Sequence, residues 1–138
     1  MGFWFPSLHL AFQAELSGDE PGQTIFFFKA LMVVGAIHEA VNQVEQGGWI
    51  TIFSDNLNTV QMFNSLATLP SMNWLLLLSV DLVLHRDVDF CVFHISGSKN
   101  MVVDHLSHLN NLDTLAAAPG LVIHPFQPPQ NALGATQK

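Results

Sequence analysis

Basic side chains are scarce in this chain of 138 residues. Lys and Arg together number four against eleven Asp and Glu, and the formal net charge is −7. With so few cations the chain has little with which to neutralise phosphates, so strong autonomous binding to nucleic acid is disfavoured. Charged residues of both signs make up only 11% of the sequence. That low share indicates a piece cut from something larger, or a surface normally covered by partners.

Cysteine and long apolar runs are also nearly absent. Cys91 is the single cysteine, so no intrachain disulfide can form, and its apolar surroundings favour a buried, inert thiol. The amino terminus has no basic n-region and no signal-peptide core. The most apolar stretch, residues 74–84, contains Asp81 and falls short of the roughly twenty residues that cross a membrane. We therefore expect an intracellular soluble domain with no membrane segment.

Hydrophobic residues make up 49% of the chain, which is ample for the core of one domain. Hydrophobic periodicity and turn residues predict an ordered series of elements. These are strands over 2–8 and 10–14, a long helix over 24–46, a strand over 49–54, helices over 57–69 and 74–86, a strand over 89–95 and a helix over 100–109. Crossovers of helical length between strands predict an α/β fold, with a mixed sheet covered by helices on its faces. The Ala- and Pro-rich residues 110–138 are interpreted as a linker or extended tail after a domain spanning 1–109.

The strand over 49–54 ends at Asp55 and Asn56, directly before a helix. A carboxylate at such a junction is where α/β folds often place their chemistry. Asp55 has two interpretations: a metal ligand, or an N-cap of the following helix, where Asp and Asn are both favoured. Spacing alone leaves both open.

Four stretches give the chain a family resemblance. They are residues 2–7, 25–31, 52–60 with 63–66, and 94–108. In this order and spacing they resemble the ribonuclease H domain of retrotransposon polyproteins, most closely the fungal type. Residues 125–129 are similar to the linker that leaves this domain in such polyproteins. The resemblance covers almost the whole chain and implies a ribonuclease H-like mixed sheet flanked by helices.

The resemblance also implies a set of site residues. In that family four carboxylates hold two Mg²⁺ ions, which cleave the RNA strand of an RNA–DNA hybrid. Asp55 and Asp104 match two of these acids, but Lys29 stands where the acid of the long helix belongs. The first acid belongs on an opening strand upstream of residues 2–7, and this sequence starts at Met1. Two acids of four remain.

Three further residues, Asn56, Asn100 and His105, are expected near this site. A pair of histidines, His105 and His108, is spaced as half of a zinc site, but zinc needs three or four converging ligands. The metal interpretation of this pair is therefore disfavoured.

The absent opening strand has a consequence for the sheet. In the ribonuclease H fold that strand lies in the middle, so the fold expected here lacks its first, central strand. The strands over 2–8 and 49–54 would then each expose an unpaired edge, which invites aggregation or pairing with another chain. We expect either an N-terminally truncated domain or a sheet rearranged around the gap.

Lys29 lies on an otherwise apolar half of the long helix, where a charge needs a partner or a route to water. One hypothesis places its ammonium beside Asp55 and Asp104, where it would partly replace the charge of the absent metal. The alternative is a side chain that reaches solvent along its apolar stem. Asp104 likewise has an alternative interpretation, a solvated residue near a helix start that the helix dipole favours.

These observations lead to one preferred function and two alternatives. The preferred one is a degenerate, inactive ribonuclease H-like domain from a retroelement polyprotein, with no cofactor and RNA–DNA hybrid only as an ancestral ligand. The first alternative is an active, Mg²⁺-dependent ribonuclease H, with Asp55 and Asp104 as metal ligands and Glu39 or Glu45 in place of the long-helix acid. The second is a non-catalytic interaction module, whose partner would be another protein or the remainder of a polyprotein.

Overall fold

The computed structural model describes residues 1–15 and 25–127, and its mixed α/β class is the one predicted from the sequence. In chain order the strands and α-helices are β1 (Gly2–Phe5), β2 (Leu10–Gln13), α1 (Ile25–Ala40), β3 (Trp49–Ser54), α2 (Leu57–Ser65), α3 (Asn73–Arg86), β4 (Asp89–His94), α4 (Met101–Ser107), α5 (Asn111–Ala117) and β5 (Val122–Pro125). Short 3-10 turns at Pro6–Leu8, Pro70–Met72 and Gly97–Lys99 join some of them.

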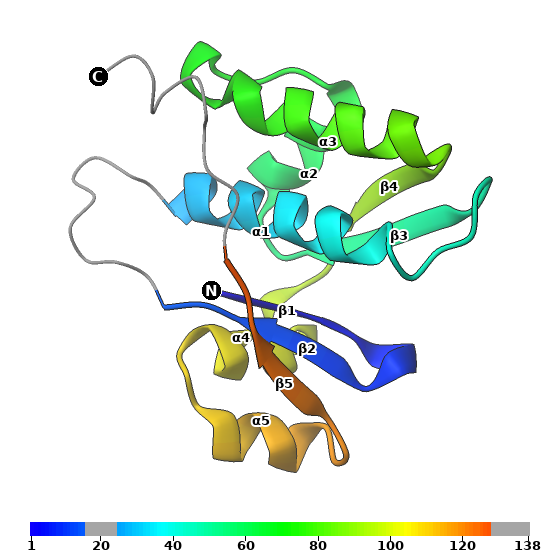
Figure 1. Ribbon diagram of the computed structural model, residues 1–138. Helices are drawn as coiled ribbons and strands as arrows, with labels where there is room; N and C mark the ends of the chain where they lie inside the picture. The colour runs from blue at the N-terminus through cyan, green and yellow to red at the C-terminus, as the bar shows by residue number, and fades with distance from the viewer. Residues whose placement is uncertain (16–24, 128–138) are drawn as a thin grey trace.

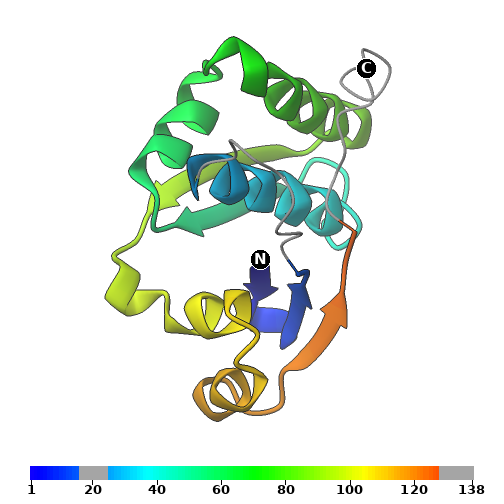
Figure 2. The same ribbon diagram turned by 90° about the vertical axis from the view of Figure 1, so that its left-hand side faces the viewer.

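The strands form two separate sheets rather than one. In the first, β1 pairs antiparallel with β2, and β2 pairs parallel with β5. In the second, β3 pairs parallel with β4. Helix α1 lies at the centre, with α2 and α3 on one side of it and the three-stranded sheet with α4 and α5 on the other (Figure 1; Figure 2). The break between the sheets falls between β1 and β3, the two strands that were expected to have unpaired edges.

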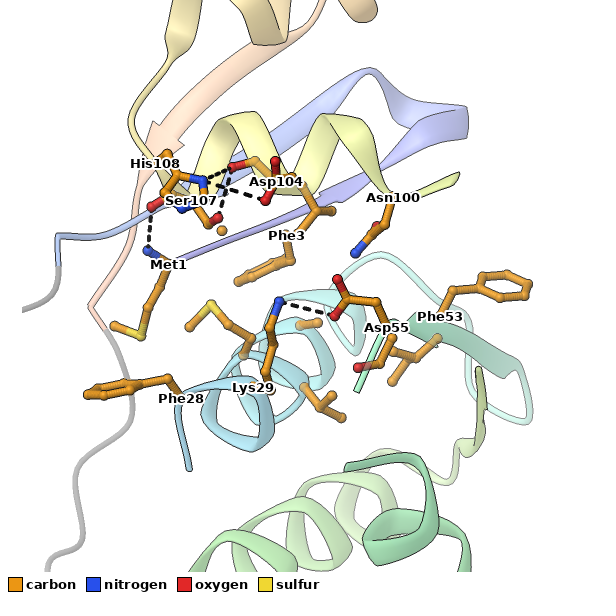
Figure 3. Close-up of a pocket in the computed structure, with 17 residues that line it drawn as sticks. Met1, Phe3, Phe28, Lys29, Phe53, Asp55, Asn100, Asp104, Ser107 and His108 are labelled. Atoms are coloured by element: carbon orange, nitrogen blue, oxygen red, sulfur yellow. Dashed lines mark hydrogen bonds and ion pairs between the residues drawn. The ribbon is translucent and has the colours of Figure 1, made fainter. Parts of the chain in front are cut away.

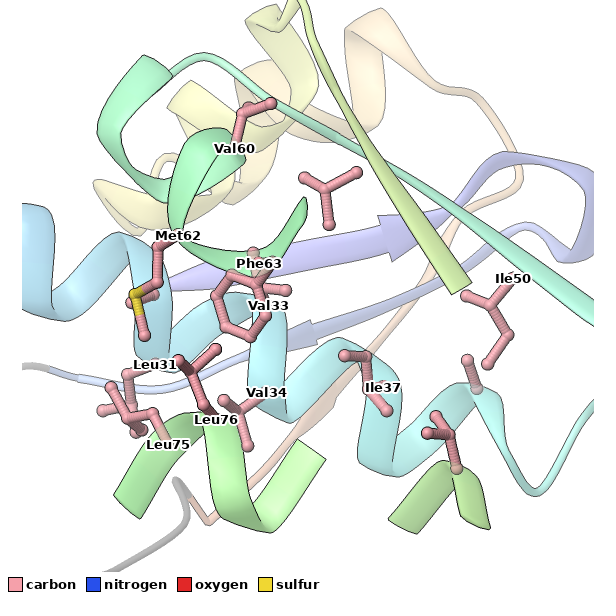
Figure 4. Close-up of a cluster of buried hydrophobic side chains, with 14 of the residues drawn as sticks. Leu31, Val33, Val34, Ile37, Ile50, Val60, Met62, Phe63, Leu75 and Leu76 are labelled. Carbon is pink, nitrogen blue, oxygen red and sulfur yellow. The ribbon is translucent and has the colours of Figure 1, made fainter. Parts of the chain in front are cut away.

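The larger hydrophobic core lies between α1, α2, α3 and the inner face of β3 and β4 (Figure 4). Helix α1 is apolar nearly all round because it packs against α3 and β3 and also against β1. Its residues Val34 and Ile37 are fully buried, as are Leu75 of α3 and Val92 of β4, and Phe63 of α2 is 2% exposed. This core fixes α1 against the strand that ends at Asp55.

A second, small cluster joins the other elements. It consists of Ala11, Leu106, Ala118 and Leu121. Polar bonds add to it: the Gln13 amide Nε2 donates to the Leu106 carbonyl at 2.8 Å and to Asn111 Oδ1 at 2.7 Å. This part of the molecule is therefore held by few apolar side chains and by hydrogen bonds from β2 to α4 and α5.

The expectation of a linker or extended tail from residue 110 onward is wrong for residues 111–117, which form α5, and for residues 122–125, which form β5 and pair with β2. The Ala- and Pro-rich composition concealed a helix with a buried residue, Thr114, whose hydroxyl donates to the Asn110 carbonyl at 2.9 Å. β5 forms because β2 offers it a free edge, which sequence composition cannot reveal. Residues 128–138 lie outside the described part of the chain.

Three helices are shorter than their patterns predicted, and the one expected over 100–109 is α4, which spans only Met101–Ser107. Helix α1 ends at Ala40, and the Arg86 guanidinium donates to the Val41 carbonyl at 3.2 Å just beyond it, taking up one of the carbonyls that a helix end leaves unpaired. Helix α2 ends before Leu66, which has a left-handed φ of 53°. Within the described ranges no single helix is long and apolar enough to cross a membrane, and α2 with Pro70–Arg86 passes that test only as a pair bent by 79°.

Candidate functional site

A cavity of about 360 Å³ opens between the two sheets. Its walls are β1, the end of β3, one side of α1 and α4 (Figure 3). The lining residues are mostly apolar and include Met1, Gly2, Phe3, Lys29, Met32, Val33, Ala36, Phe53, Asp55, Asn100, Val103, Asp104, Ser107 and His108. The cavity therefore contains Lys29, Asp55, Asn100 and Asp104, four of the residues that sequence motifs singled out.

Lys29 and Asp55 form an ion pair on the cavity wall. The Lys29 Nζ lies 3.1 Å from Asp55 Oδ1, and the two side chains are 33% and 25% exposed (Figure 3). Asp55 is available for this contact because Asn56 is the N-cap of α2, its Oδ1 accepting from the Thr59 backbone N–H at 2.9 Å. The N-cap interpretation of Asp55 is therefore wrong. The Lys29 ammonium is paired with the Asp55 carboxylate and is also partly exposed to solvent.

Asp104 sits in the first turn of α4, on the opposite side of the cavity. Its side chain is 64% exposed, and its Oδ1 lies 3.5 Å from His108 Nδ1, which also lies 2.8 Å from the Asp104 carbonyl oxygen. This environment agrees with a solvated acid near a helix start. Asn100 lines the same cavity, whereas Asn56 and His105, which were expected nearby, do not line it.

The residues present do not fit the two-metal centre that the family resemblance implies. Two Mg²⁺ ions need several hard oxygen ligands, and the cavity offers two carboxylates, one already paired with an ammonium. Across residues 1–15 and 25–127, no group of three or more His, Cys, Asp or Glu side chains is placed to hold a metal ion. Glu39 and Glu45 do not line the cavity, and Glu39 lies ten residues beyond Lys29, ~15 Å along the helix axis. No catalytic step through a metal follows from this site.

The Met1 amino group adds a further basic group to the cavity. It donates to the Ala14 carbonyl at 2.9 Å and to the Ser107 carbonyl at 3.4 Å. Burial lowers the pKa of this amine below its usual 8.0, and the nearby charge of Lys29 lowers it further. Sequence reasoning missed Met1, because its place depends on how the two sheets sit. His108 was considered only as a zinc ligand, yet its position four residues after Asp104, at the C-cap of α4, predicts their contact.

No protein-family model matches the chain, and neither the curated proteins nor the solved structures contain a significant match. The fold and the cavity define a mixed α/β domain with a mostly apolar opening between two sheets. The polar groups of this opening include the Lys29–Asp55 ion pair and the Asp104–His108 contact. The resemblance to ribonuclease H continues to rest on sequence motifs.

Proposed function

We propose that this chain is a degenerate ribonuclease H-like domain of retroelement origin that does not cleave RNA–DNA hybrids. The observation that carries the proposal is the 3.1 Å ion pair between Lys29 and Asp55 on the wall of the cavity. Asp55 matches the family acid at the end of a central strand, and the matching position on the long helix supplies a cation where the family has a carboxylate.

The charge of Lys29 argues strongly against a divalent ion at this place. A unit positive charge ~4 Å from a divalent ion, at an effective dielectric constant of about 20, repels it by about 8 kcal/mol. Asp55 would have to offset this repulsion while its own charge is shared with the ammonium. Asp104, largely exposed and close to His108, adds only one further carboxylate.

The arrangement of the strands also supports the ribonuclease H interpretation. Strands β1 and β3 each have one partner, β2 and β4 respectively, and they flank the cavity. In the family the opening strand runs between their counterparts and carries the first acid. The cavity between β1 and β3 therefore lies where the family has that opening strand.

A cleavage assay on a labelled RNA–DNA hybrid, with Mg²⁺ or Mn²⁺, tests the proposal. We expect no cleavage above a buffer control. Cleavage by the unchanged chain would overturn the proposal and favour the active, Mg²⁺-dependent alternative.

Calorimetric titration with Mg²⁺ tests the charge argument separately. The unchanged chain should show no site of sub-millimolar strength. Lys29→Glu should raise the affinity for Mg²⁺, because it places a second carboxylate beside Asp55, whereas Lys99→Glu, on an exposed 3-10 turn, should not. Equal affinities for the two variants would show that the charge at Lys29 does not control metal binding.

A further inference from the structure

Strand β1 has unpaired backbone groups along one edge. The Ala14 N–H donates to the Met1 carbonyl at 2.9 Å, and the Met1 amine donates back to Ala14. In an antiparallel pair, residues that exchange hydrogen bonds alternate with residues that do not. Gly2 and Trp4 therefore direct their N–H and C=O groups away from β2.

Strand β3 has a matching unpaired edge. Hydrogen bonds join it to its neighbour β4 at both ends. The Gly48 carbonyl accepts from the Asp89 N–H at 3.1 Å, and the Ser54 carbonyl accepts from the Ile95 N–H at 2.9 Å. Even-numbered residues of this strand thus bond to β4, so the odd-numbered ones, Trp49, Thr51 and Phe53, direct their backbone groups to the other side.

The outer edge of β4 shows how an edge is closed in this molecule. The Asn64 side chain of α2 donates to the Val92 carbonyl at 2.7 Å and accepts from the Val92 N–H at 3.2 Å. Within residues 1–15 and 25–127, no side-chain hydrogen bond of this kind reaches the free edges of β1 and β3. These two edges are the ones that flank the cavity.

The cavity lies between two helical layers. A Cβ on Gly2 would meet the Leu106 side chain of α4, and the Phe3 ring lies against Gly35 of α1, so β1 runs between these helices. Residues Met32, Val33 and Ala36 of α1 line one side of the cavity, and Val103 and Ser107 of α4 line another. A strand entering here would direct alternate side chains toward α1 and toward α4.

We infer that the cavity is a slot for one extended segment of a partner polypeptide, which pairs with β1 and β3 at once and joins the two sheets. Its side chains toward α1 are apolar, to match Met32, Val33 and Ala36. Those toward α4 are small, because α4 packs so closely on β1 that a Cβ on Gly2 would meet Leu106. This inference goes beyond the proposed loss of nuclease activity and does not depend on it.

The geometry of the slot selects an unpaired segment as the occupant. A strand that pairs with both β1 and β3 must have two free edges of its own. Each of the described strands already pairs with a neighbour along at least one edge. A second folded copy of this chain therefore has no described strand with two free edges.

Charge indicates the composition of the segment. The Lys29–Asp55 pair is neutral overall, which favours uncharged side chains in the middle of the segment. The net charge of −7 favours basic residues at its ends.

The probe is a nine-residue peptide in which valine alternates with threonine and lysine stands at both ends. Its binding to the whole chain is measured by fluorescence anisotropy. Two control peptides carry N-methyl groups, one on the odd-numbered and one on the even-numbered residues, so that each lacks the donors on one edge. Because the slot uses both edges, each methylated peptide should bind at least about tenfold more weakly than the parent.

Other outcomes of this titration would overturn the inference. If the parent peptide does not bind, the cavity is not a binding site for an extended segment. Sensitivity to only one set of methyl groups would mean simple addition to a single edge. If the chain forms dimers that the peptide does not dissociate, the free edges of β1 and β3 bind a second copy of the chain instead.

Filling the slot gives an independent test. Ala36→Phe should abolish peptide binding, whereas Ala116→Phe, on the exposed surface of α5, should leave it unchanged. Circular dichroism checks that both variants fold. If Ala36→Phe does not fold, amide hydrogen exchange on the unchanged chain decides: the peptide should slow exchange at Thr51 and Phe53, and unchanged rates there would overturn the inference. The hybrid-cleavage assay, run without peptide, reports separately on the proposed function.

Discussion

The two halves of the molecule are built in different ways. Around α1, α2, α3, β3 and β4, stability comes from a large cluster of buried aliphatic and aromatic side chains. Around β1, β2, β5, α4 and α5, four buried residues form the cluster, and the Gln13 side chain links β2 to both helices. Hydrophobic burial contributes roughly 25 cal/mol per Å². The first half should therefore hold most of the stability, and the second should depend on its contact with α1.

Two leucines permit a matched measurement of this difference, and they carry the largest expected effects. Leu75 of α3 and Leu106 of α4 are both 0% exposed. We expect Leu75→Ala to lower the free energy of unfolding by about 3–5 kcal/mol and Leu106→Ala by about 2–3 kcal/mol, because the smaller cluster can collapse further around the lost volume. Urea denaturation followed by circular dichroism measures both.

Hydrogen exchange of the two variants sharpens the comparison. Leu106→Ala should speed exchange in β2 and β5 while leaving β3 and β4 nearly unchanged, whereas Leu75→Ala should speed exchange throughout. Uniform acceleration by Leu106→Ala would show that the halves unfold as one unit.

Gly2→Ala tests the closest contact within the weaker half. A Cβ at Gly2 would lie 2.7 Å from Leu106 Cγ, so α4 must move away from β1. The expected loss is about 1–3 kcal/mol of unfolding free energy, typical of overpacking. The control is Gly97→Ala, where a Cβ would have nothing within 4 Å.

A double variant connects the two measurements. In Gly2→Ala with Leu106→Ala, the added methyl group occupies space that the truncated leucine leaves, so the combined loss should be smaller than the sum of the single losses. Additive losses would mean that Gly2 is constrained by something other than Leu106.

The sequence predicted the stronger half better than the weaker one. The bounds of β3 follow from β-branched and aromatic residues between glycines and Asp55, a pattern that local chemistry determines. β5 is different, because it is a strand only through the free edge of β2. The same contrast holds for the site. The sequence left two outcomes open for Lys29, a place beside Asp55 and Asp104 or a route to solvent. The structure shows the ion pair with Asp55, whereas the Asp104 carboxylate lies close to His108.

The cavity itself was not predictable in this way. It lies where the two halves meet, and its position depends on how α1 and α4 are spaced around β1. No local pattern encodes that spacing. The expectation of two unpaired strand edges came from the family resemblance, and the structure adds that they flank one apolar opening.

The smallest predicted effect is on the pH dependence of unfolding, and it comes from the charges of the Met1 amine and Lys29, which lie in different halves of the molecule. Burial of the Met1 amine in the β1 half, and then the charge of Lys29 on α1, lower the pKa of this amine from 8.0. Between the lowered and the usual pKa, the unfolded chain binds more protons than the folded one, so the free energy of unfolding rises with pH across that window. Below the lowered pKa both states are protonated, and above about pH 8 both are neutral, so the contribution is constant outside the window.

Urea titrations from about pH 6 to pH 9 on the unmodified and the N-terminally acetylated chain isolate this group from the histidines, because both chains share the histidine titrations. The difference in unfolding free energy between the two should change with pH below about pH 8 and level off above it. Lys29→Ala should narrow the window, because it removes the second cause of the lowered pKa and leaves the burial. If the pH window in Lys29→Ala has the same width, the Met1 amine and the Lys29 ammonium do not share one cavity. The two halves would then meet less closely than the 3.4 Å hydrogen bond from Met1 to Ser107 and the lining of the cavity indicate.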